Sequence, residues 1–386
     1  MTQPRRVLAG QTHSVVRRVA HGEFLLRPCE FVTNAIRYRL AIACQKNPDL
    51  LVHGWCSLSN HQHGNVTDAV EEGEPSQLGD WMRDVHGPLA IALNVYYDRT
   101  ENLWRDGSFF NNECHGEPSI VTQLLYTWLQ PVAAGLVKWP DEWGGFMIRP
   151  EDFGKIIFAK KPKGAVFGGT RRPPPSDPDA KAAWLAKLNA DERKALAAVD
   201  RRVREKGQTK KRFDTIKREA KFKIKSEFAD RRNPPAPSTS QSKLPEVASF
   251  RVSVPPGFED MPIEEVRAYF RDLLDKATKK LHEAMRLEGK LRFKGMQAVR
   301  EQDPRYRAPD PGEPGALRAV IGFKGEKKHR DNLVRALNAW RQSYRDAWRR
   351  YKAKEEDVVF PAGTNRMRLH ARVLAASELP HCHLRE

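Results

Sequence analysis

The chain has 386 residues, with 67 lysines and arginines against 49 aspartates and glutamates and a net charge of +18. This length is enough for a full hydrophobic core and for two or more domains. No apolar run reaches about 18 residues, so no transmembrane helix is expected. The N-terminus lacks the apolar stretch of a signal peptide. The five cysteines are irregularly spaced and include no CxxC pair, which argues against a disulfide framework. We therefore expect a soluble cytoplasmic protein.

The positive charge is concentrated downstream. Residues 1–150 contain 13 basic and 16 acidic side chains, and the remainder contains 54 and 33. Residues 201–232 alone carry 14 basic and 5 acidic side chains. An excess of this size favours a polyanion partner over a merely solvated, lysine-rich helical region. We expect a near-neutral first domain at 1–150, a basic, linker-rich helical insertion at 151–243 and a mainly helical C-terminal extension at 244–386.

The first 150 residues predict the order β-α-β-β-α-β-α. The patterns place strands at 13–19, 50–58, 61–67 and 107–114, and helices at 29–46, 77–98 and 117–131. The tight turn at Ser59-Asn60 predicts that the second and third strands pair antiparallel. The fold class is α+β, and a split βαβ sandwich of the ferredoxin-like kind accommodates this order. Its sheet would be antiparallel, with helices on one face.

The later part of the chain alternates linkers with helical segments. Linkers are expected at 164–179 and 233–242, around a charged, helix-prone stretch. A strand at 247–254 and a helix at 262–293 follow, and a last helix is predicted at 331–354. The apolar stripe of that last helix is more typical of a core than of a platform for nucleobases.

Two short motifs carry the chemistry. His61 and His63 share one face of a strand, and Tyr126 and Gln130, four residues apart, share one face of a helix. If the helix lies over the strand, two imidazoles and an amide oxygen can hold a divalent metal, with a phenol beside it. Two histidines and a glutamine without a thiolate favour Mg²⁺ or Mn²⁺ over structural Zn²⁺. Three protein ligands leave positions open for a phosphate oxygen.

Each motif alone has a structural alternative. Two histidines on a strand can be a partly buried hydrogen-bonding pair. Tyr126 stands among Leu124, Leu125 and Leu129, so it could be a core tyrosine. Taken singly, these structural interpretations are favoured. Together the motifs indicate attack of a tyrosine on a DNA phosphate, in which a bound metal stabilises the developing charge.

Four blocks of the first domain share their order and spacing with one known family. They are Phe24-Leu25-Leu26-Arg27-Pro28, Ser59-Asn60-His61-Gln62-His63, Leu103-Trp104-Arg105-Asp106-Gly107-Ser108-Phe109 and Tyr126-Thr127-Trp128-Leu129-Gln130-Pro131-Val132-Ala133-Ala134-Gly135-Leu136-Val137. The chain resembles the single-tyrosine HUH transposases, in particular the REP-associated tyrosine transposase branch, over about residues 5–150. Residues 244–370 resemble the extension of a longer subgroup, notably in Val358-Val359-Phe360-Pro361-Ala362-Gly363-Thr364.

The resemblance implies a fold and a set of roles. The fold would be the RRM-like HUH endonuclease domain. His61 and His63 match the metal-binding pair, Tyr126 the nucleophile and Gln130 the third ligand. The implied product is a 5′-phosphotyrosine link and a free 3′-OH on single-stranded DNA, at hairpins near transposon or repeat ends. A homodimer is compatible with this, with Tyr126 acting in its own subunit or in its partner's.

The sequence departs from the family at two positions. Gln62 stands between the histidines, where a hydrophobic residue is usual, and we expect it to face away from the metal. Gln130-Pro131 stands where the branch usually has Asn-Pro, and glutamine there resembles the insertion-sequence branch. Neither departure removes a catalytic group.

Several basic residues are candidates for phosphate contacts, and the basic extension could act as a clamp on DNA. They are Arg17, Arg18, Arg105, Arg201, Arg202, Lys210, Lys211 and Arg212. An alternative is a catalytically inactive or domesticated protein that only binds hairpin DNA. A replication initiator or relaxase is disfavoured by the block from Pro131 to Val137 and by the absence of a helicase-type phosphate loop.

Overall fold

The computed structural model describes residues 6–70, 76–105, 109–163, 178–204, 221, 224–225, 244–308, 321–322, 327–364 and 374–376. The chain divides into two compact units, one of Met1–Lys161 with Glu246–Glu386 and one of Pro162–Pro245. The second unit contains helix α4 (Pro178–Arg204). The linker expected at 233–242, and nearly all of that at 164–179, lie outside the described residues. The domain limits at 150 and 243 stay a prediction.

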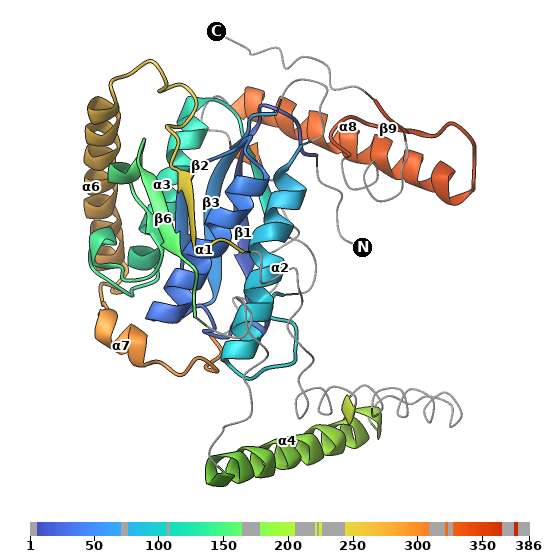
Figure 1. Ribbon diagram of the computed structural model, residues 1–386. Helices are drawn as coiled ribbons and strands as arrows, with labels where there is room; N and C mark the ends of the chain where they lie inside the picture. Colours follow the sequence, from blue (N-terminus) through green and yellow to red (C-terminus); the bar gives the residue numbers. More distant parts are fainter. Residues whose placement is uncertain are drawn as a thin grey trace. The chain divides into compact units, whose positions relative to one another are not determined.

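The first unit is built on a six-stranded sheet with the order β5-β2-β3-β1-β4-β8 (Figure 1). The strands from β5 to β4 pair antiparallel, and β8 joins β4 in parallel. This confirms the expected α+β class and the antiparallel sheet, in which β2 and β3 form the predicted hairpin. The strands are β1 (Thr12–Arg18), β2 (Leu50–Ser57), β3 (His61–Asp68), β4 (Phe110–Cys114), β5 (Met147–Ile148) and β8 (Ile321–Gly322).

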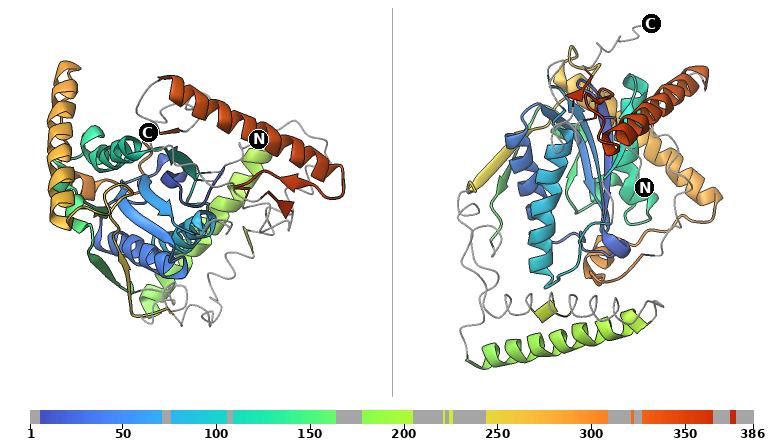
Figure 2. Two further views of the ribbon diagram at one scale, coloured as in Figure 1. Left: turned by 90° about the horizontal axis from the view of Figure 1, so that it is seen from above. Right: turned by 90° about the vertical axis from the view of Figure 1, so that its right-hand side faces the viewer.

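Helices cover both faces of this sheet, so the expectation of helices on one face was wrong (Figure 2). On one face lie α1 (Glu30–Lys46) and α2 (Leu78–Tyr96), where the ring centroids of Trp55 and Trp81 are 5.9 Å apart. On the other face lies α3 (Glu117–Ala133), whose Leu124 side chain fills the space above Gly54. The reason is visible in β2 and β3, which are buried almost throughout and not on alternate residues only. Strands buried on both faces need a layer on each side.

Residues from the C-terminal part pack against this domain. The strand β7 (Val247–Arg251) pairs antiparallel with β6 (Ile156–Lys160), a strand that the sequence patterns did not predict. The helix α6 (Ile263–Leu287) lies against α3, where Phe270 meets Trp128 with ring centroids 5.8 Å apart. Residues 246–308 therefore belong to the same compact unit as the first 161 residues. The short helix α7 (Met296–Glu301) and the 3-10 turns η1 (Ala20–Gly22), η2 (Pro140–Glu142) and η3 (Pro150–Asp152) complete it.

The last long helix is α8 (Lys327–Lys352), followed by the short strands β9 (Val359–Phe360) and β10 (Leu374–Ala375). Its apolar stripe packs into small clusters with Leu337 and Trp340 in one and Ala347, Val358 and Phe360 in another. The core interpretation of the stripe is confirmed. No helix in the described part of the chain is both long and apolar enough to cross a membrane.

Candidate functional site

The histidine pair lies on the face of β3 that α3 covers. The ring centroids of His61 and His63 are 4.9 Å apart, with the planes at 71°. Because β3 is paired on both sides, by β1 and by β2, its backbone has little freedom to move these rings apart. His63 is only 2 % exposed.

The helix α3 brings Tyr126 and Gln130 to the same place. The ring centroid of Tyr126 lies 5.5 Å from that of His63, with the planes at 76°. Gln130 donates from Nε2 to the Tyr126 carbonyl at 3.1 Å, and its side chain also forms a hydrogen bond with His61. The structure thus places all four residues of the two motifs together. Their roles as ligands and nucleophile stay a proposal.

Two buried hydrogen bonds fix how α3 sits on the sheet. The Thr127 hydroxyl donates to Oδ1 of Asn65 at 2.7 Å, and Nε1 of Trp128 donates to the Ile148 carbonyl at 2.6 Å. Asn65 follows His63 on the same face of β3. Its contact therefore sets the height of the helix directly beside the histidines. Since Thr127 and Trp128 are buried, the neighbouring Tyr126 points outward and is 52 % exposed.

Both histidines are neutral at pH 7. Burial lowers the pKa of His61 to about 4, and the charge of Arg18 adds to this, while the hydrogen bond with Gln130 acts in the other direction. Burial also lowers the pKa of His63 well below its usual value, with further contributions from His61 and Arg18. A neutral imidazole keeps a lone pair on one nitrogen, and this is the form that binds metals.

The hydrogen-bond pattern fits a ligand at this point. Neither ring nitrogen of His63 has a hydrogen-bond partner in the part of the chain that the structure describes, and an unpaired buried polar group is costly. His61 differs, because its Nδ1 lies 2.7 Å from Oδ1 of Asn60. An amide oxygen only accepts, so this contact favours the tautomer of His61 with its proton on Nδ1 and its lone pair on Nε2. This contact of Asn60 was not predicted from the sequence, although the residue directly precedes His61.

The donor set suits a hard or borderline divalent metal. Two neutral imidazoles and one amide oxygen would hold it. A ligating histidine usually donates an outer hydrogen bond such as the one that His61 makes to Asn60. Among the described residues no group of three or more His, Cys, Asp or Glu side chains could hold a metal. A third side-chain ligand at this site would therefore have to be of another type, and the Gln130 amide is the one that contacts His61.

Gln62 faces the opposite side of β3, as predicted. It is buried, its Nε2 donates to the Ser57 hydroxyl at 3.1 Å, and its Oε1 lies 3.1 Å from Nε2 of His86 on α2. Hydrogen bonds thus replace the apolar packing that a hydrophobic residue would make here.

Two of the predicted phosphate-binding arginines lie beside the histidines. Arg18 is the register partner of His61, and the bridge between Val19 and Trp104 makes Arg105 the neighbour of Arg18 on its other side. Paired residues share a face of a sheet, so Arg105, Arg18 and His61 form a row on the face of Tyr126. Both arginines are exposed.

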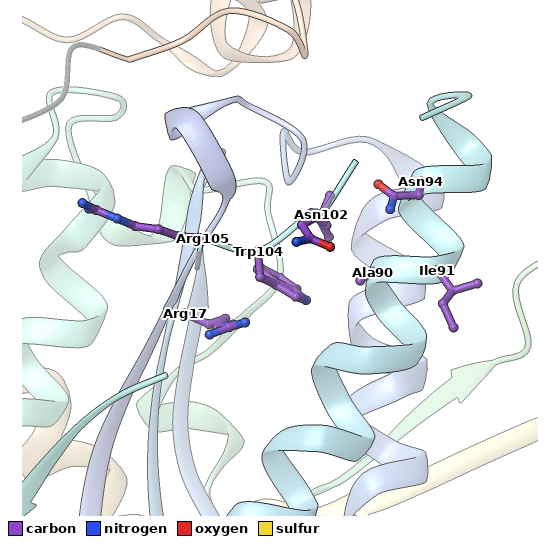
Figure 3. Close-up of a pocket in the computed structure, with 8 residues that line it drawn as sticks. Arg17, Ala90, Ile91, Asn94, Asn102, Trp104 and Arg105 are labelled. Carbon is purple, nitrogen blue, oxygen red and sulfur yellow. The ribbon is translucent and has the colours of Figure 1, made fainter. Parts of the chain in front are cut away.

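The other candidates lie elsewhere. Arg17 points to the α2 side, where its guanidinium lies 5.8 Å from the Trp104 ring centre, while Arg105 extends to the other side (Figure 3). Arg201 and Arg202 fall at the end of α4, in the second unit. Lys210, Lys211 and Arg212 lie outside the described residues.

No protein-family model and no curated protein matches the chain. Among solved structures it is similar to one described as "Structure of the REP associates tyrosine transposase bound to a REP hairpin". The identity is 19 %, the match covers 39 % of this chain and 85 % of that one, and the TM-score is 0.33. A likeness this remote fixes neither the family nor the activity of the chain, which have to be argued from its own residues.

Proposed function

We propose that the chain is a DNA transposase and endonuclease that cuts and rejoins single-stranded DNA at hairpin-containing ends. The observation that supports this best is the position of Tyr126. Its ring is exposed, yet it lies against His63, whose two ring nitrogens are buried without partners among the described residues. A core tyrosine would be buried, whereas this one stands open to solvent on a helix anchored by its neighbours. A phenol beside unused metal-ligand nitrogens suits attack on a phosphate.

The metal in this proposal is Mg²⁺ or Mn²⁺, held by His61, His63 and Gln130. A bound ion would polarise the scissile phosphate and stabilise the charge that develops on it. The protein contributes the geometry: β3 fixes the imidazoles, α3 fixes the amide and the phenol, and Asn60 fixes the proton of His61. Prepositioned groups of this kind lower the entropic part of the barrier.

In the proposed step the Tyr126 oxygen attacks phosphorus. A bond forms between this oxygen and phosphorus, and the bond from phosphorus to the 3′ oxygen breaks. The phenol loses its proton, and the leaving 3′ oxygen gains one to become a free 3′-OH. The 5′-phosphotyrosine keeps the energy of the phosphodiester, so rejoining to another 3′-OH needs no ATP. Arg18 and Arg105 would hold phosphates beside the reacting one.

A second part of the DNA grip is proposed for α8. Its apolar stripe is already packed in its own clusters, so its charged face is not needed for that packing. We call this the basic face of α8; its exposed members are Lys327, Lys328, Arg330, Arg335, Arg345, Arg349, Arg350 and Lys352. Such a face suits the sequence-independent attraction of DNA phosphates.

The test is covalent capture. The protein is incubated with single-stranded hairpin oligonucleotides and Mn²⁺ or Mg²⁺, and a protein–DNA adduct is sought on a denaturing gel. The adduct should form with the native chain and disappear in Tyr126→Phe. Tyr306→Phe is the matched control, because Tyr306 is also half exposed, at 50 %. Retained hairpin binding with no adduct over a broad set of substrates would support the inactive, DNA-binding alternative.

A further inference from the structure

A pocket of about 420 Å³ opens on the α2 side of the sheet, away from the histidine pair (Figure 3). Its lining comes from the end of β1, from the last turns of α2 and from residues 102–105. The volume is in the range of small-molecule sites, about 300–1,000 Å³. The pocket is separate from the four residues that carry the proposed chemistry.

Two amides give the pocket its polar groups. Asn94 donates from Nδ2 to the Glu101 carbonyl at 2.9 Å, and its Oδ1 is buried without a hydrogen-bond partner among the residues described. Asn102 stands exposed on the opposite wall. The Asn94 oxygen is closed off from solvent, so the exposed amide of Asn102, which both donates and accepts, is the group that can read a hydrogen-bonding edge.

The rest of the lining is flat or apolar. The Trp104 ring is held by its Nε1, which donates to the His86 carbonyl at 2.8 Å, and the Arg17 guanidinium lies over this ring. Ile91 adds an apolar side chain that is 53 % exposed. Trp104 is buried, so the Arg17 guanidinium is the more open of the two flat groups. Guanidinium planes contact the faces of nucleobases, and side-chain amides read their edges.

The pocket lies close to Arg105 and Arg18, the two arginines that form a row with His61. Trp104 and Arg105 are consecutive, and their side chains lie on opposite sides of the strand ribbons (Figure 3). A DNA strand with its phosphates on Arg105 and Arg18 would therefore run along the border of the pocket. We propose that the pocket binds one unpaired nucleobase of the DNA strand, next to the phosphate that Tyr126 attacks. This proposal rests on the proposed function and adds a site of base recognition to it.

The test compares how the loss of a single base weakens DNA binding by the native chain and by variants of the pocket. A set of hairpin oligonucleotides carries one abasic nucleotide at each position of the unpaired strand, and binding is measured by fluorescence anisotropy. With the native chain, one abasic position should weaken binding about tenfold. In Asn102→Ala, which removes one amide, and in Ala90→Leu, which fills the pocket, that same abasic position should have no further effect. Gln297→Ala, which removes an exposed amide of α7, is the matched control and should leave the tenfold loss intact.

The outcomes separate this proposal from the function on which it rests. If hairpins bind and the native chain and both variants respond alike to every abasic position, the pocket does not hold a base. If no hairpin binds and no adduct with Tyr126 forms, the proposed function fails and the base site fails with it. Because Asn102 is exposed, loss of folding would not account for a result in Asn102→Ala.

Discussion

Asn60→Ala should weaken binding of the proposed metal without changing any of its three proposed ligands. The substitution removes the oxygen 2.7 Å from Nδ1 of His61. Without this acceptor the ring can carry its proton on either nitrogen and can turn about its side-chain bonds, so Nε2 no longer presents its lone pair all of the time. The other lost contact, from Nδ2 of Asn60 to the Gly22 carbonyl, is long at 3.5 Å. The Asn60 carbonyl still accepts from the Val19 N–H at 2.8 Å, so the turn itself should persist.

The size of the effect follows from the type of contact. Loss of an outer hydrogen bond to a ligating histidine costs about 10–100-fold in metal affinity, which is about 1.4–2.7 kcal/mol. Asn60→Asp is the informative companion, because a carboxylate also accepts from Nδ1–H. We therefore expect Asn60→Asp to bind metal at least as well as the native chain at neutral pH, and Asn60→Ala to bind it at least tenfold more weakly.

The assay is titration of the DNA-free protein with Mn²⁺, with the free ion measured by electron paramagnetic resonance. Thermal unfolding in the presence of a chelator checks that all three proteins are equally folded. Native affinity in Asn60→Ala would refute the role of Asn60. An equal loss in the alanine and aspartate variants would show that the amide acts through packing and not through the proton of His61.

Three further predictions concern stability and DNA binding. Gly64→Ala should destabilise the chain by about 1–3 kcal/mol in urea unfolding, as overpacked cores do, because a Cβ there would lie 2.6 Å from the Trp55 ring; Gly79→Ala, with no heavy atom within 4 Å of the new Cβ, is the control, and equal stabilities would contradict the reasoning. The free energy of unfolding should fall as the pH drops below 6.5, by about 1.4 kcal/mol per pH unit for each buried histidine, because burial lowers the pKa of His13 and His53 to about 4 and that of His86 to about 3. The folded pKa lies below the unfolded one, so this stability is complete above pH 6.5 and is lost as the unfolded state takes up protons; a flat profile from pH 6.5 to 4 would count against it. Replacing Arg335 and Arg345 of the basic face of α8 by Gln should make the slope of log K against log salt shallower by about 0.7–0.9 per lost phosphate contact, whereas Arg286→Gln, which removes a side chain paired with Glu283 at 2.6 Å, should leave the slope unchanged.

The order of elements in the first domain could be predicted from local patterns. The spacing within each motif also sufficed to put His61 with His63 and Tyr126 with Gln130, since i, i+2 and i, i+4 neighbours share a face. The face on which α3 lies could not be predicted in this way. Residues of β2 and β3 are buried on both sides, so no alternation shows which face a given helix covers. The contact between Asn60 and His61 depends on a side-chain orientation in a tight turn, which residue types alone do not specify.

The pairing of strands that lie far apart in the chain could not be predicted from the sequence either. Ile156–Lys160 pairs with Val247–Arg251, and nothing in the sequence of either short segment identifies the other as its partner. Arg17 and Trp104 line the pocket together because a single isolated bridge joins Val19 to Trp104. Deletion of residues 155–386, a simple way to test a clamp, would also remove α6 from α3. Single substitutions on the basic face of α8 are therefore the better test.

The packing of α3 has a consequence for the timing of activity during synthesis. The outer side of this helix is covered by Phe270 of α6, which meets both Trp128 and Phe153. The ribosome must therefore release the chain well past α6 before the helix of Tyr126 is held on both sides. A nascent chain that ends before this point carries every proposed catalytic residue but lacks the support that positions them. We expect the proposed DNA cleavage to become possible only when most of the chain has emerged.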